Sequence, residues 1–265
     1  METGCNTYTV RGLARPEAFA LLHRTGFRTV ELWAGHANYL SLGLAPRRVA
    51  AEAARCDLAV RAYCIGSLVG LRPRAIEDRL ARAFDFAREL GTDLVTVALD
   101  RTGVPIADAR ARRQGVRCAL ENDWYGELAR PRDLAAALAA CSPAVGATID
   151  TGHLMFLGCD LVAAARVLAG RTFHVHLKVV RRPSATARLL ARLRRRHSME
   201  PALPGCDDGL DGFVSVMRAA GYDGMLAVEH EGEDDLAGAL ACYRRRAASL
   251  VGNGAPRSIA EAAGA

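Results

Sequence analysis

Four side chains that can bind a cation or transfer a proton lie at the ends of four apolar, strand-like segments. They are Glu121 after residues 116–120, Asp150 after 145–149, His176 within 173–177, and Glu229 after 225–228. In a parallel barrel the carboxyl ends of the strands meet on one face, and the chemistry of such barrels takes place there. Three carboxylates and one imidazole on that face would form a divalent-metal site with oxygen and nitrogen ligands.

The alternation of side chains along a strand gives these groups a direction. His174, His176 and Lys178 share one face of their segment, while Val175 and Leu177 share the other. We therefore expect His176 to point into the barrel near its top, with His174 one layer deeper and Lys178 nearer the mouth. Inward-pointing charges are costly unless they are paired or bound to metal. A cation shared by the carboxylates is the simplest explanation for them.

Strand-like and helical segments alternate along the chain, as a parallel α/β fold requires. The expected strands span residues 6–10, 29–33, 58–64, 94–99, 116–121, 145–150, 173–177 and 225–229. A chain of 265 residues fits one (β/α)8 barrel, for which about 250 residues is typical. We predict a single-domain TIM barrel over residues 1–250 and a flexible tail over 251–265.

Two connections depart from a regular barrel. The fourth crossover is short, since residues 105–114 leave room for a small helix at most. A long insertion, residues 179–209, follows the seventh strand and contains an arginine-rich helical stretch at 187–196. This insertion is read equally well as a lid over the site or as a surface excursion.

Composition limits the classes of protein to consider. The chain is 51% hydrophobic and 24% charged, as globular proteins are, and it has no apolar run long enough for a membrane span. Its net charge of +6 is carried almost entirely by arginine, which we interpret mainly as a solvated surface. The eight cysteines form no CxxC pair, which argues against a thiolate zinc site or a disulfide scaffold. Together with the lack of a signal-peptide pattern, this predicts a cytoplasmic protein.

Three motifs resemble those of the xylose-isomerase-like TIM barrels. They are IDTGH at 149–153, FHVHLK at 173–178 and GYDGMLAVE at 221–229, and the resemblance extends from about residue 27 to residue 250. That superfamily includes ketose 3-epimerases, hydroxypyruvate isomerase, inosose dehydratase and endonuclease IV. The resemblance implies one divalent metal held by Glu121, Asp150, His176 and Glu229. Manganese is the first expectation, with cobalt, magnesium, iron and zinc as alternatives.

The resemblance also implies roles around the metal. Glu121 and Glu229 would act as the acid/base pair, and His153, three residues after the aspartate, would contact the substrate. Glu127 and Arg182, each six residues after a ligand, match substrate-binding positions of the sugar enzymes. His36, just after the second strand, is a candidate pocket residue from its position alone.

We therefore expect an isomerase or epimerase of a keto sugar or keto-cyclitol that removes a proton beside a metal-bound carbonyl, through an enediolate. The expected substrate is a small polyhydroxylated molecule, with or without a phosphate group. A homo-oligomer is compatible with this reading, whereas a membrane is not expected.

Three alternatives stay open. The motifs are nearest to those of inosose dehydratase, a lyase, although Val179 stands where that group usually has aspartate and its glycine-rich segment is altered at 203–209. An abasic-site endonuclease is a remote alternative, suggested by residues 36–40 and the basic charge. Its extra metal ligands are missing, which makes nucleic acid an unexpected partner. A barrel that binds a ligand without catalysis is the third.

Overall fold

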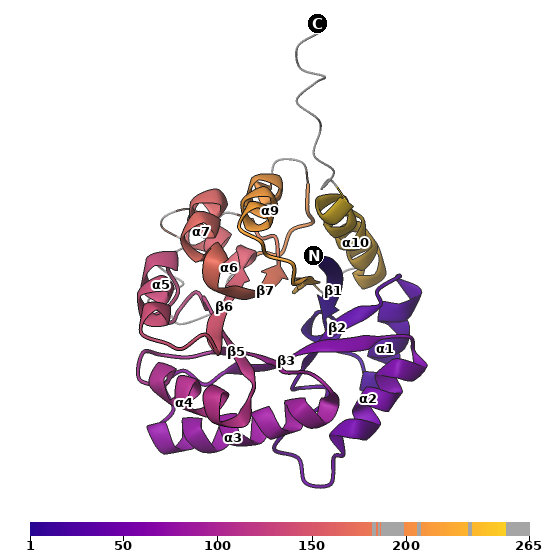
Figure 1. Ribbon diagram of the computed structural model, residues 1–265. Coiled ribbons are helices and arrows are strands. Elements are labelled where there is room, and N and C mark those ends of the chain that lie inside the picture. The colour runs from indigo at the N-terminus through magenta and orange to yellow at the C-terminus, as the bar shows by residue number, and fades with distance from the viewer. Residues whose placement is uncertain (182–183, 185, 187–198, 206–207, 233–234, 253–265) are drawn as a thin grey trace, which may run out of the picture.

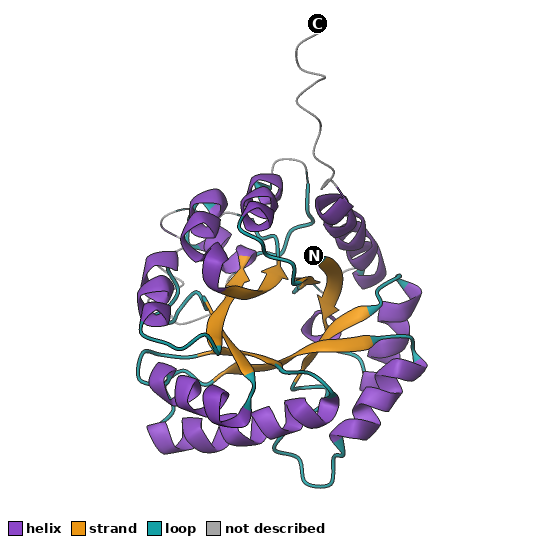
Figure 2. Ribbon diagram, viewed as in Figure 1, coloured by secondary structure: helices purple, strands orange, loops and turns teal. Residues whose placement is uncertain are grey.

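The computed structural model describes residues 1–265 except 182–183, 185, 187–198, 206–207, 233–234 and 253–265. In the described part of the chain, eight strands form a closed barrel in the order β1 to β8, and all neighbouring strands are parallel. The helices surround this barrel as an outer layer (Figures 1 and 2). The predicted (β/α)8 fold is confirmed.

The elements follow one another in regular alternation. The strands are β1 (Glu2–Asn6), β2 (Thr29–Trp33), β3 (Ala59–Ser67), β4 (Leu94–Ala98), β5 (Arg117–Glu121), β6 (Val145–Asp150), β7 (Thr172–Leu177) and β8 (Met225–Val228). The α-helices are α1 (Arg15–Arg24), α2 (Pro46–Arg55), α3 (Pro73–Leu90), α4 (Val104–Gln114), α5 (Pro131–Ala139), α6 (Thr151–Phe156), α7 (Leu161–Leu168), α9 (Leu210–Ala219) and α10 (Leu236–Gly252). Two short 3-10 helices are η1 (Thr7–Val10) and η2 (Ala169–Arg171).

Helix α3 illustrates how the sequence sets the outer layer. It begins with Pro73, whose fixed φ suits the first helical turn, and it ends at Gly91, which has a left-handed φ of 89°. Its apolar residues recur at helical spacing and are buried against the barrel. The short fourth crossover is filled by α4, a helix of 11 residues, or about three turns.

The first strand lies four residues earlier in the chain than predicted. Strand β1 ends at Asn6, and the segment predicted as a strand is η1 instead. The side chain of Asn6 accepts a hydrogen bond from the backbone N–H of Tyr8, at 2.9 Å, and this cap turns the chain out of the barrel. Asn6 therefore lies at the carboxyl end of its strand, on the same face as the predicted site.

The alternation along β7 agrees with the prediction. Val175 and Leu177 are fully buried in the layer between strands and helices, whereas His174 and His176 face the barrel interior and are each 1% exposed. Strand β7 thus has apolar side chains on the face that packs against the helices. Its polar side chains lie on the face toward the barrel interior, near the carboxyl ends of the strands. A slip of β7 by one residue would exchange these two faces.

The insertion after β7 is closed at its base by a short antiparallel pairing. Arg181 N donates to Glu200 O at 2.9 Å, and Ala202 N donates to Val179 O at 3.0 Å. The predicted helical stretch 187–196 lies outside the described residues, as does the predicted tail from residue 253 onward; residues 251 and 252 belong to α10. Among the described residues, no helix combines the length and apolar character that a bilayer crossing requires.

Candidate metal and catalytic site at the carboxyl end of the barrel

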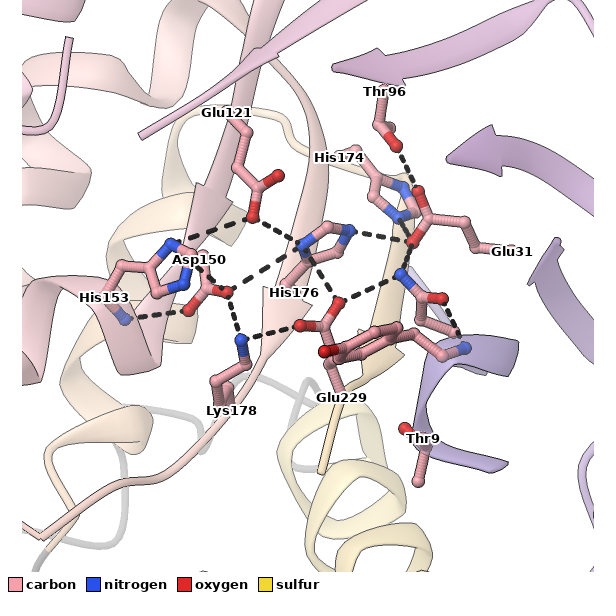
Figure 3. A network of polar contacts seen from close by, with 12 residues as sticks. Thr9, Glu31, Thr96, Glu121, Asp150, His153, His174, His176, Lys178 and Glu229 are labelled. Carbon is pink, nitrogen blue, oxygen red and sulfur yellow. Dashed lines mark hydrogen bonds and ion pairs between the residues drawn. The ribbon is translucent and has the colours of Figure 1, made fainter. Parts of the chain in front are cut away.

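The four side chains predicted to share a cation converge in the barrel (Figure 3). The Nδ1 atom of His176 lies 3.3 Å from Glu121 Oε1, 3.4 Å from Glu229 Oε2 and 3.9 Å from Asp150 Oδ2. Each comes from the end of a different strand: β5, β6, β7 and the residue after β8. One imidazole nitrogen is therefore surrounded by three carboxylates.

Backbone contacts fix the position of Asp150. It pairs with His176 across the β6–β7 register, and its side chain caps α6 by accepting from His153 N at 2.9 Å. Asn122, the residue after Glu121, accepts from the backbone N–H of Asp150 at 2.7 Å and donates to its carbonyl at 3.2 Å. These two hydrogen bonds between the ends of β5 and β6 hold the side chains of Glu121 and Asp150 in a fixed relation.

A buried carboxylate that the sequence analysis missed lies beneath this cluster. Glu31 on β2 is 0% exposed, and its Oε2 lies 2.8 Å from His176 Nε2 and 3.1 Å from His174 Nε2. It also accepts hydrogen bonds from Thr96 Oγ1 and from Asn6 Nδ2. An acidic residue on the inward face of an apolar strand was the signal available in the sequence.

Glu31 determines how His176 is oriented. Burial, the largest effect, raises the pKa of Glu31, but the imidazoles of His176 and His174 outweigh it and hold this pKa well below its usual range. An ionised Glu31 accepts a hydrogen bond from the Nε2–H of His176, so Nδ1 is left facing the three carboxylates. Asn6 Nδ2 also donates to Glu229 Oε2 at 2.9 Å and so connects the two layers.

The electrostatics of the cluster differ from one group to the next. Burial lowers the pKa of His176, yet the carboxylates of Glu31 and Glu229 more than reverse this and raise the pKa well above normal. Burial raises the pKa of Glu229 to about 7, against the opposing charges of Lys178 and His176. Burial likewise raises the pKa of Asp123 to about 8, with the charge of Glu121 adding to the effect.

Lys178 is part of the site and not a peripheral residue. Its side chain is 2% exposed, and Nζ lies 2.6 Å from Glu229 Oε1, 2.7 Å from Glu231 Oε1 and 3.0 Å from Asp150 Oδ2. The lysine contacts two of the four predicted ligands, whereas the sequence placed it only near the mouth (Figure 3).

The predicted substrate-binding residues have different fates. His153 lines the cavity, with Nδ1 3.7 Å from Glu121 Oε1, and burial lowers its pKa, which favours the neutral imidazole. His36 does not line the cavity. Its Nε2 is 3.1 Å from Leu13 O, and its ring centroid is 5.6 Å from that of Trp33, which does line the cavity. His36 therefore supports a cavity residue without lining the cavity.

Glu127 and Arg182 are not brought to the cavity by any described contact. Glu127 is exposed and accepts a hydrogen bond from the backbone N–H of Arg101 at 3.0 Å, away from the cluster. Glu127 is not among the residues that line the cavity, so a count of six residues from Glu121 does not lead to the lining. Arg182 lies outside the described residues.

The cavity above the cluster has a volume of about 190 Å³. Its walls are aromatic, since Tyr8, Trp33, Trp124 and Tyr125 line it, and its floor is made by the ionisable groups. Tyr125 Oη donates to Ser67 Oγ at 3.0 Å across part of the rim. The volume is below the roughly 300–1,000 Å³ typical of drug-sized ligands, so the cavity suits a small molecule.

The donor set fits a divalent cation. Within the described residues, Asp150 Oδ2 and His153 Nδ1 are buried and accept no hydrogen bond, although each lies close to other charged groups. Among the described residues, three overlapping sets have ligand atoms within 4.8 Å of one another: Asp150 with His176 and Glu229, Asp150 with Glu121 and His153, and Glu31 with His174 and His176. Oxygen-rich sites with one or two imidazoles suit manganese, zinc, magnesium or iron.

Comparison with known proteins agrees with this architecture. The chain is 31% identical over 125 residues to the uncharacterized protein YfiH of Bacillus subtilis (strain 168); the matched region is 43% of this chain and 40% of that relative. A xylose isomerase-like TIM barrel/4-hydroxyphenylpyruvate dioxygenase fusion protein has a similar structure, with a TM-score of 0.73 and 22% identity over 91% of this chain and 41% of its own. The chain therefore spans about two fifths of each of these two proteins.

Two other similar structures match over almost their whole length. The IolI protein, solved with a bound zinc atom, has a TM-score of 0.75 and 14% identity, covering 96% of this chain and 99% of that one. An L-ribulose 3-epimerase has a TM-score of 0.71 and 17% identity, covering 97% and 99%. At these identities the likeness establishes the fold alone. The sequence profile described as "Xylose isomerase-like TIM barrel" matches residues 19–247, and the chain therefore belongs to that family.

Proposed function

We propose that the protein is a divalent-metal-dependent isomerase or epimerase of a small keto sugar or keto-cyclitol. One observation carries the proposal: His176 Nδ1 lies within 3.9 Å of three carboxylates, and two of these, Glu121 and Glu229, also line the cavity. Glu121, Asp150, His176 and Glu229 would hold the cation, with manganese as our first expectation. A zinc atom in the similar IolI structure and the sugar epimerase among the similar structures support the same reading.

The chemistry follows from the placement of two glutamates. When bound, a divalent cation would polarise a substrate carbonyl and the neighbouring hydroxyl, and so acidify the C–H bond next to the carbonyl. Glu121 is the last residue of β5 and Glu229 follows β8. Because β6 and β7 separate these strands, the two carboxylates would approach a bound substrate from different sides. One carboxylate would remove the proton and the other would return it, while the His153 imidazole stabilises the developing negative charge.

The lining favours an uncharged polyhydroxylated substrate. Four carboxylates line the cavity: Glu121, Asp123, Glu229 and Glu231. The one lysine among the described lining residues is already paired with carboxylates, so it offers a phosphate group little attraction against the surrounding negative charges. The aromatic walls would pack against the apolar face of a sugar or cyclitol ring.

A dehydratase of the inosose type is the second candidate. Asp123 lines the cavity, and its pKa of about 8 keeps it largely protonated at neutral pH. A protonated acid beside the cavity is what a departing hydroxyl group requires. Loss of water would then replace return of the proton.

A screen of free ketoses, keto-cyclitols and their phosphates, with the Mn²⁺-loaded protein in D2O, tests the proposal. We expect deuterium to enter recovered substrate or product next to the carbonyl, and chelation with EDTA to lower the rate by at least about 100-fold. Restored activity on re-adding Mn²⁺ is the control. An ultraviolet-absorbing dehydrated product would identify the dehydratase instead, and no turnover by the metal-loaded protein on the whole panel would refute both.

The affinity for Mn²⁺ should fall as the pH is lowered from about 8 to 6. Glu229, with a pKa of about 7, gains a proton over this range, and its protonated form cannot bind a cation. The pKa of His176 is raised well above normal, so His176 must also lose a proton before Nδ1 can bind the metal. A raised pKa means that the group holds its proton more tightly in the folded, metal-free protein. The metal must displace this proton in order to bind. Titration calorimetry at several pH values would measure this, and the Glu229→Gln variant, lacking one of the protons, should show a smaller slope. A pH-independent affinity would contradict the assignment.

A further inference from the structure

Lys178 lies between carboxylates at the carboxyl ends of β6 and β8, the two strands that flank β7, which Lys178 directly follows. Its Nζ lies within 3.0 Å of Asp150, at the end of β6, and of Glu229 and Glu231, which follow β8. An ammonium group has three N–H donors. Lys178 has as many carboxylate partners as it has N–H groups, so it is suited to holding these side chains and not to binding a substrate oxygen.

The residues after Asp150 are shaped around this lysine. A Cβ added at Gly152 would lie 2.5 Å from both Cγ and Cδ of Lys178, closer than side-chain atoms approach, so only glycine leaves room for the lysine stem. Thr151 Oγ1 donates to Lys178 O at 2.6 Å and accepts from Lys178 N at 3.0 Å. Three consecutive residues, Asp150, Thr151 and Gly152, therefore contact the ammonium, the backbone and the stem of one side chain.

The position of Nζ bears directly on the two functions of Glu229. Oε1 of Glu229 is 2.6 Å from Nζ, while Oε2 accepts from Asn6 Nδ2 at 2.9 Å and lies 3.4 Å from His176 Nδ1. The two oxygens are thus held by different partners, and the carboxylate cannot rotate without breaking one of the contacts. Asp150 Oδ2 is in turn shared between Lys178 and the predicted cation cluster.

We propose that Lys178 is a positioning residue: its ammonium fixes the orientation of Glu229 for proton transfer and shares Asp150 and Glu229 with the bound cation. The inference rests on the function proposed above and extends it. Because the ammonium and the cation are like charges on the same carboxylates, the lysine weakens metal binding while it improves catalysis. A residue that only supports the fold would not weaken metal binding and improve catalysis at the same time.

Replacing Lys178 with methionine keeps the length of the stem and removes the charge. We expect the affinity for Mn²⁺ to increase roughly tenfold, because a like charge is removed from the shared carboxylates. We also expect kcat to fall about 100-fold with KM changed by less than about threefold, because a misplaced acid/base group slows the chemical step. Mn²⁺ affinity is read by calorimetry or by the spin-resonance signal of the free ion, independently of any substrate.

Gly152→Ala tests the position of the ammonium without removing its charge. The new methyl group should displace the Lys178 stem and lower kcat by at least about tenfold, while Mn²⁺ affinity stays within about threefold of wild type. In a Lys178→Ala background, where the stem is gone, the same change should cause no further loss. Gly170→Ala is the matched control, since an added Cβ there meets nothing within 4 Å.

The outcomes separate the two proposals. Weaker Mn²⁺ binding by Lys178→Met, unchanged kcat in that variant, or an equal effect of Gly152→Ala with and without the lysine stem would each overturn the role of Lys178. If wild type turns over no compound of the panel, the function proposed above fails, and the Mn²⁺ affinities of the variants still decide whether Lys178 shares its carboxylates with the cation. Should Lys178→Met fail to fold, Gly152→Ala, compared with its Gly170→Ala control, carries the test, and an unchanged kcat in Gly152→Ala would overturn the role of Lys178.

Discussion

Replacing Glu121 with glutamine should lower kcat/KM by about 10³–10⁴-fold on the substrate that the screen identifies, near the upper end of what one acid/base group contributes. The amide keeps the shape of the side chain but cannot take up a proton. In the wild-type protein, Oε1 of Glu121 lies 3.3 Å from His176 Nδ1, so the substitution also removes one negative charge from the group of predicted metal ligands. Steady-state kinetics at saturating Mn²⁺ separates the two effects, because excess metal would restore only the part due to weaker metal binding.

The matched control for this variant lies in the following loop. Glu127→Gln makes the same chemical change at an exposed glutamate that accepts a hydrogen bond from the backbone of Arg101. We expect its activity to stay within about twofold of wild type, as for surface changes away from a site. A large loss in Glu127→Gln would mean that this glutamate reaches the substrate after all. A Glu121→Gln enzyme with near-normal turnover would remove Glu121 from the acid/base pair.

Replacing Glu31 with alanine should lower the free energy of unfolding by about 3–5 kcal/mol, the usual result of breaking a buried ionic network from one side. The variant leaves the N–H groups of His176 and Asn6 without their acceptor and removes the carboxylate that lies 3.1 Å from His174 Nε2. Loss of the group that orients His176 should also weaken Mn²⁺ binding by about 10–100-fold. Denaturant unfolding and metal titration measure the two effects separately.

The stability contribution of Glu31 should also depend on pH. Its pKa is lowered in the folded protein, so its contribution is present above the unfolded pKa and disappears as the pH falls through the folded pKa. Glu52→Gln is the control, because its ion pair with Arg15, at 2.8 Å, is partly exposed and should contribute no more than about 1 kcal/mol. Equal destabilisation by the two substitutions would contradict a special role for Glu31.

The sequence was sufficient to predict the convergence of four side chains. Strand periodicity and the parallel barrel decide which face a side chain takes and at which end it lies, and Glu121, Asp150, His176 and Glu229 depend on nothing else. The role of Glu31 could not be predicted, because it depends on how deep the side chain lies inside the barrel and on which strands stand opposite β2. Periodicity along one strand contains neither quantity.

Counting residues along loops was less reliable than counting along strands. Glu127 has the expected spacing from Glu121, but a loop has no fixed rise per residue, and Glu127 is exposed and does not line the cavity. The first strand was displaced for a related reason. Thr7, Tyr8 and Val10 favour strands by residue type, but the cap formed by Asn6 ends the strand before them.

Helices α2 and α5, each beginning with proline, were not assigned from the sequence.

Lys178 has one more consequence, because it is the single lysine of the whole chain and is almost completely buried. Protein produced with lysine labelled with ¹⁵N at Nζ would give one side-chain NMR signal, and that signal would originate inside the candidate site. It needs no assignment, and it would report metal loading, substrate binding and changes of protonation directly. Amine-directed coupling at neutral pH would meanwhile attach the protein through its amino terminus and leave this group intact.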